Sequence, residues 1–497
     1  MDSFFENIAA HLGDQVSGDH VKLIFCILAT YPLALIYRTL PTDSPNSRHL
    51  FSIAYAVIAM VFVLKLYMGM LHITITALFT YTFMRLYHGK NGPYINFVVA
   101  MISMSICHID RQLKGFEGSS KLDYSGALMI LTIKFTSFGF NVADGRSGAV
   151  TDYNKRMKID PFPSPIEYLG WLCYFAGFLV GPTCEYMDYY RFTNYFFVSP
   201  SKHLSPYRPA FQKFVFFLVT AWLVAFVGQH YNYFRMMEDD FAASPFYKKI
   251  FALEIVGRLQ HCKYGCMWLL AEGACVLSGF GYNGIRNGKH QWDRLSNIYW
   301  VGLEGAQSFK DISNSWNLGC NTWLRHYVYM RLCPPGAKPD SYVLVGTYTV
   351  SAFWHGFHPG YYALISGFGI YQALSRSVRR TIRPLVMSTD GKTPLPVWKN
   401  LYDIASYIAT NYSSAILMAP FELLYVSRTR KVWSSIYYIH IWGYLTVWAV
   451  VTFLGPTLKQ IQKGRVERAI TNDKKNVAAK KIECAVQELE LKQQKLI

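Results

Sequence analysis

The sequence predicts an all-α fold, a helical bundle that crosses a membrane several times. Three observations support this: 52% of the 497 residues are hydrophobic, only 16% are charged, and apolar runs recur along most of the chain. A membrane-spanning helix needs about 20 mostly apolar residues. Because several of the runs are shorter, we expect about eleven spans, some of them tilted, interrupted or buried among other helices.

The apolar runs follow one another with polar links between them. Residues 1–19 carry acidic side chains and no lysine or arginine, so the first run is expected to be a retained span and not a cleaved signal peptide. A long, moderately polar region rich in Trp, Asn and Gly covers residues 282–325. The runs are residues 21–37, 50–64, 71–84, 95–106, 126–133, 168–180, 214–227, 266–280, 343–353, 361–374, 404–421 and 432–454.

The basic residues are concentrated near the C-terminus. Residues 457–497 hold ten basic and five acidic residues, and residues 376–399 hold six basic residues against Asp390. Basic flanks of membrane spans usually stay in the cytosol. The sequence therefore divides into an N-terminal extramembrane segment (1–20), a transmembrane domain (21–456) and a basic cytosolic tail (457–497), helical or disordered. We expect no nucleic-acid partner, because no soluble domain presents a basic face.

The cysteines and glycines give little sign of a bound group. The ten cysteines are scattered without CxxC pairs, as expected of buried thiols that pack as small apolar side chains. His261, Cys262 and Cys266 form the one cluster resembling metal ligands, but no second pair completes a tetrahedral site, so we expect no metal. Residues 279–284 match GxGxxG without a surrounding βαβ unit, which favours a tight loop over a dinucleotide site.

A histidine at the end of an apolar run is the strongest candidate for chemistry. His355 follows the run 343–353 and precedes a second apolar run. Gly356 and Gly360 allow close approach of a ligand or backbone, and Pro359 breaks the helix. An ionisable group in such a place is costly and often functional. The alternative is an interfacial histidine that bonds a backbone carbonyl.

A second polar cluster lies upstream, in residues 313–327. Asn314, Asn317 and Asn321 have spacings that would place them on one helix face, and Trp316 and Trp323 supply apolar walls. A carboxamide can donate a hydrogen bond to an oxyanion without carrying charge. The alternative is a polar seam between membrane helices.

Two common catalytic patterns are missing from the sequence. No serine lies in GxSxG, and no histidine is followed after four residues by aspartate. The HxxxxD box of one large glycerolipid acyltransferase family is therefore absent, and such chemistry in this chain would need a different arrangement of residues.

Several short segments together resemble the membrane-bound O-acyltransferase (MBOAT) family, in its lysophospholipid acyltransferase branch. The resemblance extends from near residue 50 to near residue 455. The segments are Lys134 with Asp144-Gly145-Arg146, residues 162–170, residues 177–182 with Glu185-Tyr186 and Asp188-Tyr189, Trp316-Asn317 with Trp323-Leu324, and residues 351–356 with Pro359-Gly360-Tyr361.

The resemblance implies a reaction chamber inside the bundle, with His355 and Asn317 as the catalytic pair. The expected reaction is acyl transfer from acyl-CoA, a co-substrate, to the free hydroxyl of a lysophospholipid, in the endoplasmic reticulum membrane and without a metal or cofactor. Apolar surroundings would keep His355 neutral as general base, and Asn317 would hold the thioester carbonyl. Substrate-binding candidates are Asn314, Asn321, Trp316, Trp323, Arg325 and Trp354, with Arg331 and the basic residues of 376–383 near the entry of coenzyme A.

Three alternatives stay open at this point. The first is an MBOAT enzyme with a sterol, diacylglycerol or protein as acceptor. The second is a multi-pass transporter with a polar path lined by the asparagines and His355. The third is an inactive scaffold of the same fold that binds lipid or partners through its basic tail.

Overall fold

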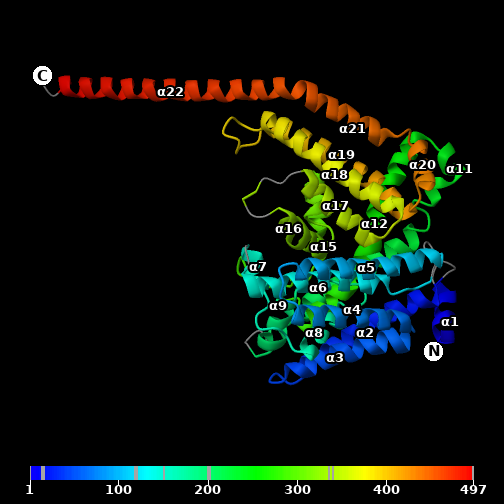
Figure 1. Cartoon of the computed structure of the whole chain (residues 1–497). Helices are drawn as coiled ribbons and strands as arrows, with labels where there is room; N and C mark the ends of the chain where they lie inside the picture. The colour runs from blue at the N-terminus through cyan, green and yellow to red at the C-terminus, as the bar shows by residue number, and fades with distance from the viewer. Residues whose placement is uncertain are drawn as a thin grey trace.

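The protein is described from a computed structural model that covers residues 2–12, 17–116, 121–148, 151–198, 203–333, 336–337 and 341–494. Within these ranges nearly all regular structure is helical, as predicted, and the only sheet is a short antiparallel pair of β1 (Ile285–Arg286) and β2 (Lys289–His290). Figure 1 shows the helices gathered into one bundle, from which the C-terminal helix extends.

The N-terminal helices build one side of the bundle. Helix α2 begins with a capping box, since the Ser17 hydroxyl accepts from the backbone of His20 and the His20 ring faces the backbone N–H of Ser17. Helix α6 is the most buried of the candidate spans, since 78% of its most apolar stretch is buried inside the protein. The elements are α1 (Asp2–Leu12), α2 (Gly18–Thr39), α3 (Pro45–Val57) with η1 (Ile58–Val63), α4 (Tyr67–Leu86), α5 (Gly92–Leu113) and α6 (Ser125–Ser147).

The middle of the chain alternates short helices with two long ones. A cluster of buried aromatic rings surrounds the short helices that follow α6, and Lys134 of α6 donates to the backbone oxygens of Trp171 and Leu172 at the end of α8. The elements are α7 (Asp152–Met157), α8 (Pro165–Leu172), α9 (Tyr186–Arg191), η2 (Phe192–Phe196), α10 (Tyr207–Trp222), η4 (Leu223–Val227), η5 (Arg235–Met237), α11 (Asp239–Ala243) and α12 (Phe246–Ser278).

The segment after the β-hairpin contains short helices, and the last third contains long ones. Helix α17 packs against η6, α5 and α18, and α18 packs against α19. The elements are α13 (Trp300–Glu304), α14 (Phe309–Ser313), α15 (Leu318–Trp323), η6 (Leu324–Tyr329), α16 (Met330–Leu332), α17 (Ser341–His355), α18 (Pro359–Thr381), η7 (Arg383–Val386), α19 (Pro396–Leu423), α20 (Val426–Ser435), α21 (Ile439–Ala449), η8 (Val450–Leu454) and α22 (Gly455–Gln494).

Six helices of the described chain are long and apolar enough to cross a membrane, so the predicted number of about eleven is not confirmed. They include Gly18–Thr39, which agrees with the predicted first span. The six are Gly18–Thr39, Pro45–Val63, Gly92–Leu113, Ser125–Ser147, Tyr207–Val227 and Ile439–Glu488.

Two apolar runs do not form the continuous helices that we expected. In the run 168–180 only α8 is helical, and turns follow it, because the aromatic side chains pack into the core around irregular backbone. The run 432–454 is divided between α20 and α21, since Tyr437 and Tyr438 have positive φ angles of 54° and 52°. Apolar composition correctly predicted that the run 168–180 is buried. It wrongly predicted a continuous helix in both runs.

The expectations for the cysteines and for the GxGxxG segment are confirmed. The ten cysteines are free, and most are buried. Gly279 ends α12 with a φ of 103°, and Gly284, with a φ of 81°, directly precedes β1, so the GxGxxG segment is a tight loop. The tail is helical as α22, and Arg465 fastens its start by donating to the backbone oxygens of Leu385 and Met387.

Candidate active site

His355 lies at the break between α17 and α18. It is the last residue of α17, and Gly356, with a φ of 122°, ends the helix. The imidazole is half-buried among aromatic rings, with centroid distances of 5.0 Å to Phe421 and 5.7 Å to Tyr361. Among the described residues none makes a hydrogen bond to this imidazole. Packing therefore holds the ring while its nitrogens stay available to a substrate.

The backbone around His355 is fixed by close contacts with neighbouring helices. His108 of α5 donates from Nε2 to the backbone oxygen of Trp354, 3.0 Å away, at the C-terminal end of α17. A Cβ atom on Gly360 would lie 1.9 Å from the backbone oxygen of Pro420, so only glycine lets α18 begin against the end of α19. That contact brings Phe421 to the His355 ring.

Asn317 adopts a left-handed conformation, with φ 45° and ψ 56°, directly before α15. Asparagine tolerates this region better than most residues do. Its Oδ1 accepts a hydrogen bond from Nδ2 of Asn297 at 3.2 Å, whereas no described residue accepts a hydrogen bond from its Nδ2. The half-buried carboxamide thus presents its N–H donors to whatever occupies the site.

An aromatic chain connects the two candidate residues. Trp316, next to Asn317, lies 6.2 Å from Tyr264 between ring centroids. Tyr264 lies 6.1 Å from Phe421, which packs on His355. A second connection joins Trp323 of α15 to Trp354 of α17 at 6.0 Å. The ring of His355 and that of Trp316, the chain neighbour of Asn317, therefore belong to one aromatic cluster.

Three of the predicted binding residues serve as packing or tethering groups. Trp323 is buried and donates to the Thr136 hydroxyl at 2.8 Å. Trp354 is buried and donates to the backbone oxygen of Met129 at 3.0 Å. Asn321 donates to the backbone oxygen of Ser313. These contacts fix α14, α15 and α17 around the cluster.

The expectation that Asn314, Asn317 and Asn321 share a helix face is wrong. Asn314 ends α14 and is exposed, and the left-handed backbone of Asn317 separates α14 from α15. Of the two arginines near the expected entry of coenzyme A, Arg325 is exposed. Arg331 forms two hydrogen bonds with Asp144, at 2.9 and 2.6 Å, so its charge is already neutralised.

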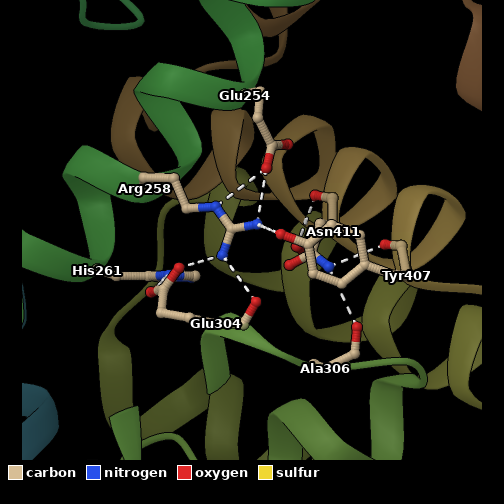
Figure 2. A network of polar contacts seen from close by, with 8 residues as sticks. Glu254, Arg258, His261, Glu304, Ala306, Tyr407 and Asn411 are labelled. Carbon is tan, nitrogen blue, oxygen red and sulfur yellow. Dashed lines mark hydrogen bonds and ion pairs between the residues drawn. The ribbon is translucent and has the colours of Figure 1, made fainter. Parts of the chain in front are cut away.

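His261, from the cluster that resembled metal ligands, belongs to a network of ion pairs. Nδ1 of His261 faces a Glu304 carboxylate oxygen at 2.8 Å, and Arg258 lies between Glu254 and Glu304 (Figure 2). Tyr407 and Asn411 of α19 complete it, with Asn411 donating to the backbone oxygen of Ala306. The network fastens α12 and α19 to the segment that leads into α14.

The sequence places Glu185 within a family motif, and the structure shows it as a buried, hydrogen-bonded carboxylate. It accepts hydrogen bonds from the hydroxyls of Tyr153 and Tyr327, both at 2.9 Å, and from Nδ2 of Asn141 at 3.1 Å. Burial raises the pKa of Glu185 to about 7, although the tyrosine hydroxyls oppose the rise. Glu185 thus joins α6 and α7 to η6, the helix that continues α15.

We predict that Glu185 makes the protein less stable as pH rises. A carboxyl with a higher pKa in the folded state than the ordinary 4.5 contributes stability at low pH, and this is lost as pH rises to about 7. Glu185→Gln removes the titration. The melting temperatures of purified wild-type and variant protein are measured between pH 4.5 and about 7. The melting temperature of the variant should rise relative to that of the wild type as pH rises. A difference in melting temperature that stays constant across this pH range would contradict the raised pKa of Glu185.

Two residues at the site escaped the sequence analysis, namely Asn297 and His108. No local pattern singles out either residue, since each acts through a contact with a residue far away in the sequence. Asn297 contacts Asn317, and His108 contacts Trp354. Only the tertiary structure identifies them.

The fold and the site together define a helical protein with six candidate membrane spans and a half-buried histidine and asparagine. The profile of the membrane-bound O-acyltransferase family matches residues 117–419. The chain belongs to this family of acyltransferases, as its sequence motifs indicated.

Its curated relatives come from fungi, plants and animals. A lysophospholipid acyltransferase of Schizosaccharomyces pombe is 34% identical, over 88% of this chain and 86% of that protein. Lysophospholipid acyltransferase 2 of Arabidopsis thaliana is 28% identical over 87% of this chain and 92% of its own length. Human membrane-bound glycerophospholipid O-acyltransferase 1 is 29% identical over 86% of this chain and 88% of its own length.

Proposed function

We propose that the protein transfers an acyl group from acyl-CoA to the free hydroxyl of a lysophospholipid. The observation that carries the proposal is an imidazole, His355, and an amide donor, Asn317, each without a hydrogen-bond acceptor or donor on its free nitrogens among the described residues, with the rings packed on His355 leading through Tyr264 to Trp316, the chain neighbour of Asn317. The names of the relatives in fission yeast and Arabidopsis support a lysophospholipid as acceptor.

His355 acts as the general base in this proposal. An alcohol is a weak nucleophile at neutral pH, so the imidazole removes the hydroxyl proton as the oxygen attacks the thioester carbon. The carbonyl oxygen gains negative charge, and the Asn317 amide donates to it. When the carbon–sulfur bond breaks, the proton passes from His355 to the thiolate, directly or through water. The products are a diacyl phospholipid and free coenzyme A.

The environment of the pair suits this reaction. Aromatic side chains pack on His355 and on Trp316, the chain neighbour of Asn317, and they limit access of bulk water, which would hydrolyse the thioester. The acceptor arrives from the bilayer, and acyl-CoA arrives from the side of the basic tail. We assign that side to the cytosol and the protein to the endoplasmic reticulum membrane. The reaction needs no further cofactor.

A panel of acceptors with one acyl-CoA tests the proposal. Purified protein in lipid vesicles should acylate a lysophospholipid, and it should not acylate a sterol, diacylglycerol or peptide. Phospholipid product and free thiol should appear in equal amounts, and His355→Ala protein is the matched control. Acylation of another acceptor in place of lysophospholipid, or solute flux without loss of thioester, would overturn the assignment.

A further inference from the structure

The segment before α13 contains a buried asparagine that is bonded to the start of α15. Asn297 is 4% exposed. Its backbone oxygen accepts from the Leu318 N–H at 3.0 Å, and its side-chain Oδ1 accepts from the Gly319 N–H at 3.0 Å. Its Nδ2 donates to Oδ1 of Asn317 at 3.2 Å. Three groups of one residue therefore meet three consecutive residues, 317 to 319.

These contacts change what Asn317 can do at the start of the helix. An asparagine in this position normally folds its side chain back onto the N–H of the second or third helical residue. Here the backbone N–H of Gly319, the second helical residue, is already bonded to Asn297. The Asn317 side chain makes no capping bond. Asn297 thus caps α15 from another segment and releases the Asn317 carboxamide for a different use.

The contact also sets which end of the Asn317 carboxamide faces the site. Only an acceptor can meet the N–H of Asn297, so Oδ1 of Asn317 points inward and its Nδ2 points away from Asn297. A catalytic amide that stabilises an oxyanion must present N–H and not oxygen. With a 180° rotation of the carboxamide, the oxygen would face the thioester oxygen and repel it.

Asn297 is itself held in place by neighbouring helices. Its backbone N–H donates to Glu272 of α12 at 2.6 Å, and the other oxygen of Glu272 accepts from Lys213 of α10 at 2.6 Å. Gly319 fits closely, because a Cβ atom there would lie 2.7 Å from the Thr183 side chain and 3.3 Å from Oδ1 of Asn297. The orientation is therefore imposed by rigid elements outside the substrate site.

We propose that Asn297 is a positioning residue for acyl transfer, which turns the N–H donors of Asn317 toward the thioester oxygen. The inference rests on the proposed role of Asn317 and adds the residue that gives its carboxamide a direction. Asn297 touches neither substrate in this account and acts only through Asn317.

Two variants of Asn297 test this role. In Asn297→Asp the carboxylate still accepts from Gly319 but cannot donate, so Asn317 rotates to offer its own N–H to it. Turnover (kcat) should fall by about 10- to 100-fold with little change in KM for acyl-CoA, since one oxyanion donor is misdirected. The neighbouring charges are Glu272 and Lys213. Since a protonated carboxyl donates as the amide does, the activity relative to wild type should fall as pH rises.

The uncharged variant Asn297→Ser also loses turnover, because its shorter side chain cannot reach Asn317. Each substitution is then repeated in Asn317→Ala protein. There it should lower the residual rate by less than about twofold, because residues that act as a unit are not additive. Asn154→Asp, another buried asparagine of the chain, is the control for a new carboxyl group and should keep wild-type turnover.

The outcomes distinguish the positioning role of Asn297 from the proposed catalytic role of Asn317. A loss in either Asn297 variant that disappears in Asn317→Ala protein supports the positioning role. A loss of equal size in both backgrounds, or no loss in either variant, overturns it. Wild-type turnover in Asn317→Ala protein alone would instead overturn the proposed role of Asn317.

Discussion

Replacement of His355 by alanine should lower kcat for phospholipid formation by about 10²- to 10⁴-fold, because the reaction loses its general base. The imidazole is held by ring contacts alone, so its removal breaks no hydrogen bond within the described structure. Binding of acyl-CoA should survive. The measurement is the initial rate with purified protein in vesicles, together with the melting temperature and the affinity for acyl-CoA.

His358 is the matched control for this prediction. It lies three residues further on and is buried at the start of α18, where its ring packs against Tyr425 at 5.2 Å. His358→Ala should lower the melting temperature through lost packing but keep turnover per folded molecule. If His355→Ala retained wild-type turnover in folded protein, His355 would not be the base. If only His358→Ala lost turnover, the base would be His358.

Replacement of Asn317 by aspartate should lower kcat by about 10²- to 10³-fold, the cost of losing one oxyanion donor. Aspartate has the same shape, tolerates the left-handed backbone, and can still accept from Asn297. It has no N–H, and its charge repels the developing oxyanion. The change therefore tests the donor and leaves the local fold intact, which alanine does less cleanly at a φ of 45°.

The measurement for Asn317→Asp is the rate of a single turnover with acyl-CoA already bound. The melting temperature should stay close to that of wild type. Asn321→Asp is the control, because Asn321 uses its amide to bond the Ser313 backbone and should lose stability before it loses the chemical step. Wild-type turnover in Asn317→Asp would show that the reaction does not use the amide.

Much of the fold followed from local sequence. The apolar runs predicted α2, α4, α5 and α10, and the Gly-Pro pattern after His355 predicted the break between α17 and α18. These features depend on hydrophobicity and backbone chemistry within a few residues, which a single sequence displays. The first span was predicted on the same basis.

The failures have tertiary causes. Helical spacing placed three asparagines on one face, but α14 ends before Asn314, and Asn317 adopts a left-handed backbone where Asn297, twenty residues earlier in the chain, bonds the start of α15. The aromatic run at 168–180 gave no sign that packing would replace the helix by turns. His108 is one histidine in an apolar helix until its contact with Trp354 is known. Such contacts join distant segments, and local patterns do not encode them.

The central claim is that His355 and Asn317 together move an acyl group from coenzyme A to a lysophospholipid. The most direct measurement is a single-turnover reaction in which loss of thioester and gain of diacyl phospholipid are followed together, in wild-type and His355→Ala protein. In the wild type we predict that thioester loss and phospholipid gain are equal in amount. In the variant we predict neither thioester loss nor phospholipid gain on the same timescale. Phospholipid formation at the wild-type rate in folded His355→Ala protein, or thioester loss without phospholipid in the wild type, would contradict the claim.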